Sequence, residues 1–435
     1  MIPTARLWAS LCLLALPALL AGFIPELRLS VLLLDAGVLG LAAVDFALTR
    51  KLALEVLRTL PAKLSVGVAN PVTLSVRNRG RRTLTLQLHE DLPETFTASV
   101  NPLSVVVPGR SRAELSYRLT PTQRGRFELG DISLRAKSPL GFFVHEHAEP
   151  TRTRVSVYPD LRGASRLLLS GAALDLVNLG LRRLSADGRG SEFARLRDYS
   201  QGDSQRDVDW KATARRQRPV TRVLETERSQ SVLICIDAGR SMAGQMHGLS
   251  KLDHAVNAAL FLAFVALRNG DRVGLCVFAD GVKAFVAPQA GRGHYRRIVE
   301  TLYAAKPQLT YVDYPALFKA LSVRLRRRTL LCLFTDYVDP VQSLRLIAPL
   351  RQLSRRHVAL CLSLQDPAVE SLLDRVPRTA ELAFEQAAAS ELQADREQLK
   401  TRMVQTGIQL VDVQPEELSL AAVNRYLDLK ARGRL

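Results

Sequence analysis

The apolar residues of this chain follow three patterns in turn, and the first is a pair of long apolar runs. Residues 7–24 and 29–48 each approach the roughly 20 residues that a helix needs to cross a bilayer. The short link PELR between them predicts an antiparallel helical hairpin. Basic residues outside the two runs outnumber the single Arg28 of the link, so the positive-inside rule places both ends of the hairpin in the cytoplasm. The flanking basic residues are Arg6, Arg50, Lys51, Arg58 and Lys63.

Two features of these runs allow other interpretations. The small residues ALLAG near the end of the first run are also typical of a signal-peptide cleavage site, although a second span would still hold the rest of the chain in the cytoplasm. Asp35 and Asp45 weaken the second span, because an Asp at the bilayer centre costs roughly 3 kcal/mol. We expect Asp45 to lie near the end of its span, and Asp35 to face the first helix or the outer interface.

The second pattern covers residues 52–160, where apolar and polar residues alternate in short segments separated by turn residues. Clear examples are VTLSVRN, LTLQLHE and AELSYRLT. Short strands at this spacing predict an immunoglobulin-like β-sandwich. Nothing in this segment resembles a catalytic set, so we expect a spacer or an interaction module.

The third pattern covers residues 230–435, where continuous apolar runs alternate with helical segments. Uniformly apolar strands with helices between them predict a mostly parallel sheet covered on both faces, as in Rossmann-type α/β domains. The predicted strands are SVLICID, RVGLCVFAD, TLLCLFTD, HVALCLSL and IQLVDV, and the predicted helices span about 251–268, 293–304, 313–327, 341–356, 387–405 and 415–430.

These patterns divide the chain into four parts. They are a transmembrane hairpin (1–51), the β-domain (52–160), a connector (161–229) and the α/β domain (230–435). Within the connector, residues 161–187 show a signal for one short helix.

Composition narrows the class of partner. The formal net charge of +18 is compatible with an anionic ligand. Between Arg182 and Arg228, however, twelve basic and eight acidic residues are interleaved, so there is no stripe of one sign, and we expect no nucleic-acid binding. The four cysteines after Cys12 lie singly in apolar strand-like runs, which indicates buried free thiols in a reducing compartment.

Two predicted strands of the α/β domain end in a carboxylate. Asp237 ends the first strand and Asp336 ends another, while Ser241 and Thr310 lie on neighbouring loops. Ligands of open α/β sheets bind beyond the carboxyl ends of the strands, and such oxygen groups suit Mg²⁺. The alternative is that each Asp only caps the helix that follows it.

These residues resemble the metal-ion-dependent adhesion site of von Willebrand factor A domains, whose pattern is Asp-x-Ser-x-Ser, then Thr, then Asp. The match consists of Asp237, Ser241, Thr310 and Asp336, but Gly239 stands where the first Ser belongs. The resemblance therefore implies a von Willebrand factor A-like domain with a degenerate Mg²⁺ site, to which Asp313 is a further candidate carboxylate.

The densest mixture of charges is the stretch DYSQGDSQRDVDWKATARR, residues 198–216. Its carboxylates have Arg or Lys nearby, which keeps them ionised and argues against a general acid. The spacing also lacks the Gly and the distant Glu of an EF-hand loop. We predict a structural junction in which Arg–Asp pairs fix a turn and Trp210 packs against the α/β domain, with partner recognition as the alternative. The residues assigned to this role are Arg197, Tyr199, Gly202, Asp203, Arg206, Asp209, Trp210 and Arg215.

Almost the full length resembles the bacterial family filed as domain of unknown function fifty-eight. The resemblance rests on the apolar hairpin, RGRFELGDISLRAKSPLGFF, GSEFARLRDYSQGDSQRDVDWKATARR, IDAGRSM and the C-terminal GIQLVDVQPEELSLAAVNRYLDLKARGRL. It implies a multi-pass protein of the bacterial inner membrane with cytoplasmic soluble domains. It also implies partnership with a MoxR-type AAA+ ATPase and with other von Willebrand A-domain proteins.

The sequence thus favours a non-enzymatic, membrane-anchored adaptor. One alternative is a metal-dependent hydrolase or nuclease that uses Asp237 and Asp336 with the carboxylates of 198–209. Another is a structural envelope protein that binds through its β-domain.

Overall fold

The structure is a computed structural model that describes residues 1–49, 52–160, 192–200, 205–225, 229–337, 340–433 and 435. These residues form two compact units, Met1–Tyr158 and Pro159–Leu435, and each is described by itself. The short helix predicted within 161–187 lies outside the described residues, as do Gly202 and Asp203.

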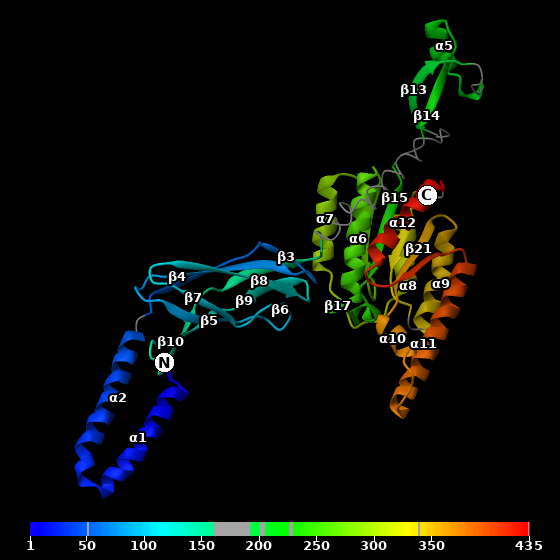
Figure 1. Cartoon of the computed structure of the whole chain (residues 1–435). Helices are drawn as coiled ribbons and strands as arrows, with labels where there is room; N and C mark the ends of the chain where they lie inside the picture. Colours follow the sequence, from blue (N-terminus) through cyan, green and yellow to red (C-terminus); the bar gives the residue numbers. More distant parts are fainter. Residues whose placement is uncertain (50–51, 161–191, 201–204, 226–228, 338–339, 434) are drawn as a thin grey trace. The chain divides into compact units, whose positions relative to one another are not determined.

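The chain begins with two apolar helices that run antiparallel to one another (Figure 1). They are α1 (Ala5–Phe23) and α2 (Arg28–Thr49), joined by the 3-10 turn η1 (Pro25–Leu27). Among the described residues, only α2 is long and apolar enough to cross a membrane, with a mean hydropathy of 2.1, whereas α1 contains a shorter apolar stretch. The structure therefore supports one of the two predicted spans.

Asp45 fixes the end of α2 to the β-rich part of the same unit. Its side chain is fully buried. One carboxylate oxygen accepts hydrogen bonds from the Ser138 hydroxyl at 2.5 Å and from the Phe142 backbone N–H at 3.2 Å, and the other accepts from the Leu140 N–H at 3.0 Å. The Thr4 hydroxyl donates to a carbonyl of this turn at 2.6 Å. A charged residue at the end of an apolar helix is thus explained by three hydrogen bonds.

The rest of the first unit is built of strands, as the alternating pattern predicts. A five-stranded sheet has the order β1-β11-β10-β5-β7, a four-stranded sheet β2-β4-β8-β6 and a three-stranded sheet β3-β12-β9. Alternate residues point inward, and Leu74 and Val76 from one sheet and Leu86 and Leu88 from another are fully buried. The strands are β1 (Ile2–Pro3), β2 (Leu54–Thr59), β3 (Lys63–Ser65), β4 (Asn70–Asn78), β5 (Leu84–Glu90), β6 (Phe96–Ala98), β7 (Leu103–Val107), β8 (Arg112–Pro121), β9 (Gly125–Leu129), β10 (Ile132–Lys137), β11 (Phe143–Glu149) and β12 (Thr153–Tyr158).

The second unit begins, in its described part, with an antiparallel pair of strands. They are β13 (Glu192–Asp198) and β14 (Val220–Glu225). The 3-10 turn η2 (Gln205–Asp207) and the short helix α5 (Trp210–Arg216) lie between them in the chain. The sequence pattern did not predict this pair of strands.

The remainder is a six-stranded sheet of order β19-β18-β15-β20-β21-β22, in which only β19 runs antiparallel to its neighbour. The mostly parallel sheet predicted from the apolar runs is confirmed. Its strands are β15 (Ser231–Asp237), β18 (Arg272–Phe278), β19 (Val282–Gln289), β20 (Leu330–Phe334), β21 (Val358–Leu364) and β22 (Gln409–Val413). A short 3-10 helix, η3 (Arg240–Ala243), and the small pair β16 (Gln245–Met246) and β17 (Leu249–Ser250) lie in the connection after β15.

Helices flank this sheet (Figure 1). Leu233 and Cys235 of β15 share a core with residues of α8, α9 and α11. The four strand cysteines are buried and free, as predicted. The helices are α6 (Lys251–Arg268), α7 (Arg292–Ala304), α8 (Tyr314–Arg324), α9 (Pro340–Ser354), α10 (Pro367–Leu373), α11 (Ala380–Gln405) and α12 (Leu418–Ala431). The structure differs from the sequence prediction in three elements. The helix α11 begins at Ala380, seven residues before the expected 387, and α10 and the edge strand β19 were not predicted.

Candidate functional site

The two strand-end carboxylates lie at the same edge of the sheet. Asp237 ends β15, and Asp336 follows the end of the parallel neighbour β20. Because parallel strands carry their carboxyl ends to one edge, the two residues come together although 99 positions separate them in the numbering (336 − 237). Both are buried, at 0% and 6% exposure.

Asp237 accepts hydrogen bonds from the loop that follows it and from the neighbouring strand end. Its Oδ1 accepts from the Gly239 backbone N–H at 2.6 Å, and its Oδ2 accepts from the Thr335 hydroxyl at 2.6 Å. The Thr335 hydroxyl in turn contacts the Tyr314 hydroxyl at 3.0 Å. Burial raises the pKa of Asp237 to about 6, and the nearby Asp336 adds to the increase, while these hydrogen bonds oppose it.

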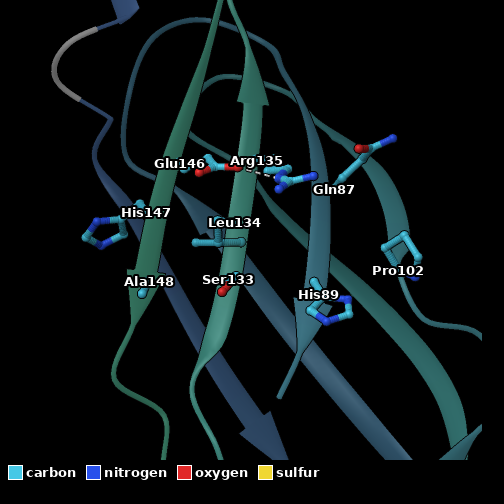
Figure 2. Close-up of a pocket in the computed structure, with 9 residues that line it drawn as sticks. All are labelled: Gln87, His89, Pro102, Ser133, Leu134, Arg135, Glu146, His147 and Ala148. Atoms are coloured by element: carbon cyan, nitrogen blue, oxygen red, sulfur yellow. Dashed lines mark hydrogen bonds and ion pairs between the residues drawn. The ribbon is translucent and has the colours of Figure 1, made fainter. Parts of the chain in front are cut away.

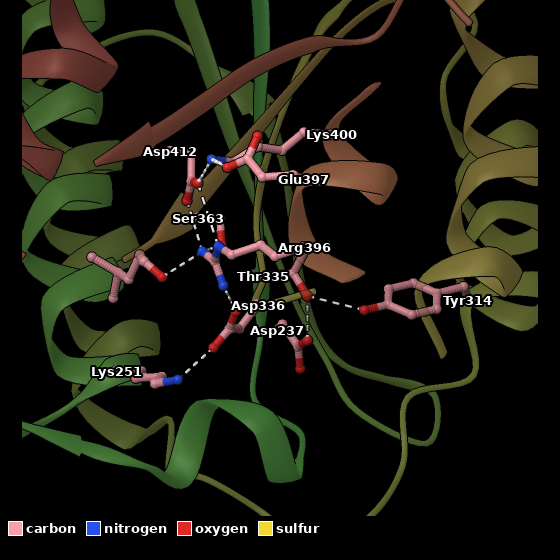
Figure 3. Close-up of polar contacts among 11 residues, drawn as sticks. Asp237, Lys251, Tyr314, Thr335, Asp336, Ser363, Arg396, Glu397, Lys400 and Asp412 are labelled. Atoms are coloured by element: carbon pink, nitrogen blue, oxygen red, sulfur yellow. Dashed lines mark hydrogen bonds and ion pairs between the residues drawn. The ribbon is translucent and has the colours of Figure 1, made fainter. Parts of the chain in front are cut away.

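Asp336 is paired with two cations of the chain itself (Figure 3). Its Oδ2 lies 2.5 Å from the Lys251 ammonium nitrogen, and its Oδ1 lies 3.2 Å from Nη1 of Arg396. Lys251 is the first residue of α6, whereas Arg396 comes from the middle of α11. Both side chains are only about a tenth exposed.

Arg396 links Asp336 to a third carboxylate, Asp412 on β22. Its Nη2 lies 2.7 Å from Oδ1 of Asp412 and also donates to the Ser363 hydroxyl at 3.0 Å. The Lys400 ammonium lies 2.7 Å from the other Asp412 oxygen. Burial alone would raise the pKa of Asp412, but the hydrogen bonds and charges of Arg396 and Lys400 outweigh it and hold that pKa below its ordinary value. We call Lys251, Asp336, Arg396 and Asp412 the ion cluster.

The residues present do not fit a divalent metal ion. All four oxygens of Asp237 and Asp336 already accept hydrogen bonds or ion pairs from the chain. A Cβ atom at Gly239 would lie 2.7 Å from a Val312 methyl carbon and 3.1 Å from the Thr310 carbonyl oxygen, so the missing hydroxyl ligand has no space. The cavity beside Asp336 is about 10 Å³, room for about one water, whereas Mg²⁺ usually keeps several.

The other predicted metal ligands lie near this edge but take different roles. Thr310 is exposed, and its backbone carbonyl accepts from the Arg240 N–H at 2.9 Å. Ser241 lies in η3. Asp313 caps α8 by accepting from the Ala316 N–H at 3.0 Å.

Exposed side chains lie on the two loops that follow Asp237 and precede Asp313, which are joined by the hydrogen bond from the Arg240 N–H to the Thr310 carbonyl. Leu309 is 82% exposed and Tyr311 is 58% exposed. The Arg240 guanidinium lies 5.9 Å from the centre of the Tyr311 ring, and its Nη1 donates to the Tyr311 hydroxyl at 3.3 Å. We call Arg240, Leu309 and Tyr311 the rim.

The charged stretch of residues 198–216, which we call the signature stretch, begins at the end of β13 and ends with α5. Asp209 caps α5 by accepting from the Ala212 N–H at 2.9 Å. Arg218 and Asp198 form an exposed ion pair at 3.1 Å, of a kind that contributes little stability. Trp210 is 71% exposed and no residue of α5 is buried, and the packing of Trp210 against the α/β domain stays a prediction.

The other predicted residues of that stretch are placed as follows. Tyr199 donates its backbone N–H to the Pro219 carbonyl at 3.0 Å, and Arg197 donates to the Asp198 carbonyl at 3.4 Å. Arg215 is exposed in the last turn of α5. Arg206 lies in η2. Their role as an interaction or structural signature stays a prediction.

A hollow lies on one face of the five-stranded sheet in the β-rich unit (Figure 2). Its volume is about 440 Å³. Arg135 and Glu146 form an ion pair across it at 2.6 Å, with His89 and His147 at its sides. No cluster of three or more His, Cys, Asp or Glu suited to a metal occurs among the described residues, here or elsewhere.

Sequence reasoning found the two strand-end carboxylates but missed the cations that hold them. Lys251 is 85 residues from Asp336, and Arg396 is 60 residues from it, so no local spacing reveals either pair. Asp412 could have indicated a buried ion pair from the sequence, because a carboxylate within an apolar strand needs a buried partner of opposite charge.

Comparisons with solved structures give only weak likenesses. Part of native alpha-2-macroglobulin from Escherichia coli matches 25% of this chain and 17% of its own, at 15% identity and a TM-score of 0.22. A CARDB domain from Pyrococcus furiosus matches 24% of this chain and 88% of its own, at 18% identity and a TM-score of 0.17. Scores this low carry no argument about fold or function.

Sequence relatives and a family profile are more informative. Uncharacterized proteins of Mycobacterium tuberculosis and Mycobacterium bovis are 30% identical over 190 residues, which is 43% of this chain and 59% of theirs. The chain thus matches about three fifths of the length of these relatives. Residues 195–405 match the family described as protein of unknown function DUF58, and this segment contains the signature stretch, the rim and three residues of the ion cluster. The chain is therefore similar to the DUF58 family over residues 195–405.

Proposed function

We propose that this protein is a non-enzymatic, membrane-anchored adaptor. Its α/β domain, which we interpret as von Willebrand factor A-like, would present the carboxyl edge of its sheet to a protein partner. The partner we propose is a MoxR-type AAA+ ATPase, because the resemblance of the whole chain to its bacterial family implies that association.

The observation that carries this proposal is the rim. Leu309 and Tyr311 project an aliphatic and an aromatic side chain into solvent, and Arg240 stacks against the aromatic ring. Tyr and Arg are enriched among residues that dominate protein–protein binding energy. Backbone hydrogen bonds from Arg240 to Thr310 and from Gln308 to Ala238 join the two loops that carry the rim, which suits a docking surface held in a fixed shape.

The carboxylates support an interaction role over a hydrolytic one. A general base must lie within hydrogen-bond reach of the proton that it abstracts, and a metal ligand must present an oxygen to the ion. The oxygens of Asp237 and Asp336 instead accept from donors of the chain, and both side chains are buried. This arrangement favours the adaptor over the metal-dependent hydrolase.

The helix α2 supports the anchoring part of the proposal, since it is long and apolar enough to cross a membrane. We propose that α1 (Ala5–Phe23) spans with it, because its 19 residues approach the required length. The basic residues outside the hairpin would then place the soluble parts on the cytoplasmic side.

The test is a cross-linking pull-down of the full-length tagged protein from native membranes. A variant with Leu309→Ser and Tyr311→Ser is expected to lose at least about tenfold of the captured MoxR-type ATPase, since two hot-spot residues contribute about 1.4 kcal/mol or more between them. The matched control is Val323→Ser, because Val323 is 74% exposed on α8 outside the rim. Equal capture of the ATPase by the rim variant and the control would refute this surface, and identification of no such ATPase with wild-type protein would refute the partner.

A further inference from the structure

We propose that the Lys251 ammonium takes the place of a divalent cation at the strand-end carboxylates, which makes this α/β domain independent of metal. The inference concerns the domain alone and does not rest on the adaptor function. It rests on how Lys251 is held, on the charge balance of the ion cluster and on the space around the carboxylates.

The position of Lys251 is fixed by the local structure on both sides. Ser250 and Asp253 form a capping box at the start of α6, so the backbone of Lys251 cannot shift freely. The Lys251 backbone N–H donates to the Gly244 carbonyl at 2.8 Å, and the side chain lies over Gly244, where an added Cβ would approach its Cε to 3.3 Å. The ammonium is thereby delivered to Asp336 at 2.5 Å.

This position is electrostatically unfavourable for a lysine unless a carboxylate compensates. A cation in the first turn of a helix opposes the helix dipole. Lys251 is also buried, at 8% exposure, which disfavours an unpaired charge. Asp336 supplies the compensating charge, so the two residues depend on one another.

The ion cluster has no net charge, because Asp336 and Asp412 carry two negative charges and Lys251 and Arg396 carry two positive charges. The charge of Lys400 beside Asp412 is offset by Glu397, which lies 2.7 Å from the Lys400 ammonium. Asp237 adds a single negative charge when it is ionised, so a divalent cation would still leave an excess of positive charge in a buried region. It would also have to approach Asp336 beside the Lys251 ammonium and the Arg396 guanidinium, whose positive charges already contact both oxygens of Asp336 and would repel it.

The first experiment measures metal binding directly on the full-length protein in detergent. Mn²⁺ prefers carboxylate oxygens. Free aqueous Mn²⁺ gives an electron paramagnetic resonance signal that is lost when the ion binds to a protein. Wild-type protein is expected to leave the signal of equimolar Mn²⁺ unchanged. Lys251→Ala removes the ammonium and frees Asp336, so this variant is expected to decrease the signal.

Thermal unfolding gives an independent readout of the same variants. We expect the wild-type midpoint to be unchanged by EDTA, Mg²⁺ or Mn²⁺. Lys251→Ala is expected to unfold at a lower temperature and to recover roughly 5–10 °C when Mn²⁺ exceeds its Kd by about 100-fold. Lys319→Ala, at an exposed position of α8, is the matched control and should behave as wild type.

Lys251→Arg keeps the positive charge and serves if Lys251→Ala does not fold. We expect Lys251→Arg to fold and, like the wild type, to leave the Mn²⁺ signal unchanged. Stoichiometric Mn²⁺ binding by the wild-type protein, or a wild-type midpoint that falls with EDTA, would overturn the proposal. So would a folded Lys251→Ala protein that neither binds Mn²⁺ nor is stabilised by it.

Discussion

Asp237→Asn is expected to stabilise the α/β domain at neutral pH and to lose this advantage in acid. Burial raises the pKa of Asp237 from 3.8 to about 6, so the folded state binds this proton more tightly than the unfolded state. The stabilisation from the protonated carboxyl is complete below the unfolded pKa and is lost as the pH rises through the folded pKa. At pH 7 and above, the charged carboxylate therefore costs the wild-type protein about 3 kcal/mol.

The substituted side chain keeps the local hydrogen bonds. An Asn carbonyl can accept from the Gly239 N–H, and its amide can donate to the Thr335 hydroxyl, which is free to turn towards Tyr314. The variant lacks the titrating group. Its free energy of unfolding relative to wild type should therefore grow by about 2 kcal/mol between pH 4.5 and pH 7.5.

The buried thiols provide the assay. The only two tryptophans, Trp8 and Trp210, lie outside the six-stranded sheet, so tryptophan fluorescence does not report its unfolding. The four strand cysteines are buried, and in a Cys12→Ser background their labelling in urea follows this domain alone. Urea titrations at several pH values then give the free energy of unfolding of each protein.

Two comparisons make the outcome decisive. Acid also weakens the pairs of Asp412, whose pKa is lowered, but this loss is common to both proteins and cancels in their difference. Asp313→Asn, at an exposed helix cap, is the control and should show no comparable growth. A difference between Asp237→Asn and wild type that is constant with pH, or that increases towards acid, would refute the reasoning.

Three further substitutions test other parts of the structure. Gly239→Ser restores the hydroxyl of the metal pattern, but its Cβ would lie 2.7 Å from a Val312 methyl carbon. We expect this variant to lose about 1–3 kcal/mol of stability in urea titration. We also expect it to leave the Mn²⁺ signal unchanged. Lys430→Met should cost about 3–5 kcal/mol in urea titration, because it leaves the fully buried Asp271 without the ammonium 2.6 Å away; no loss would contradict this. Asp45→Ala removes three hydrogen bonds from the turn at 138–142, and hydrogen exchange of that turn should accelerate at least about tenfold while β13 is unaffected.

Strands buried on both faces were predictable from the sequence, because short continuous apolar runs that alternate with helical segments are typical of parallel strands covered on both faces. SVLICID became β15 and HVALCLSL contains β21. Helix boundaries were less predictable where the amphipathic pattern is absent. The first turns of α11 were missed because Phe384 is 77% exposed on a helix with little apolar stripe, and the true start is marked only by the Thr379 cap.

The candidate site was predictable only in part, for a physical reason. The positions of Asp237 and Asp336 follow from the parallel sheet, which any chain of this pattern shares. The partners of Asp336 come from helices, and which helix face meets the sheet edge is decided by packing. The hydroxyl pattern suggested a metal, whereas the crowding around Gly239 and the reach of Lys251 appear only in three dimensions.

The ion cluster has a consequence for how related chains can vary. Its charges are buried against opposite charges, so replacing a single member leaves an unbalanced charge in a buried region at a cost of several kcal/mol. Relatives should therefore exchange these positions in matched sets, keeping all four charges or replacing opposite charges together. In related chains that have no lysine at the start of α6, we expect one of two outcomes. Either an uncharged residue replaces the carboxylate after β20, or a metal ion takes the place of the lysine ammonium.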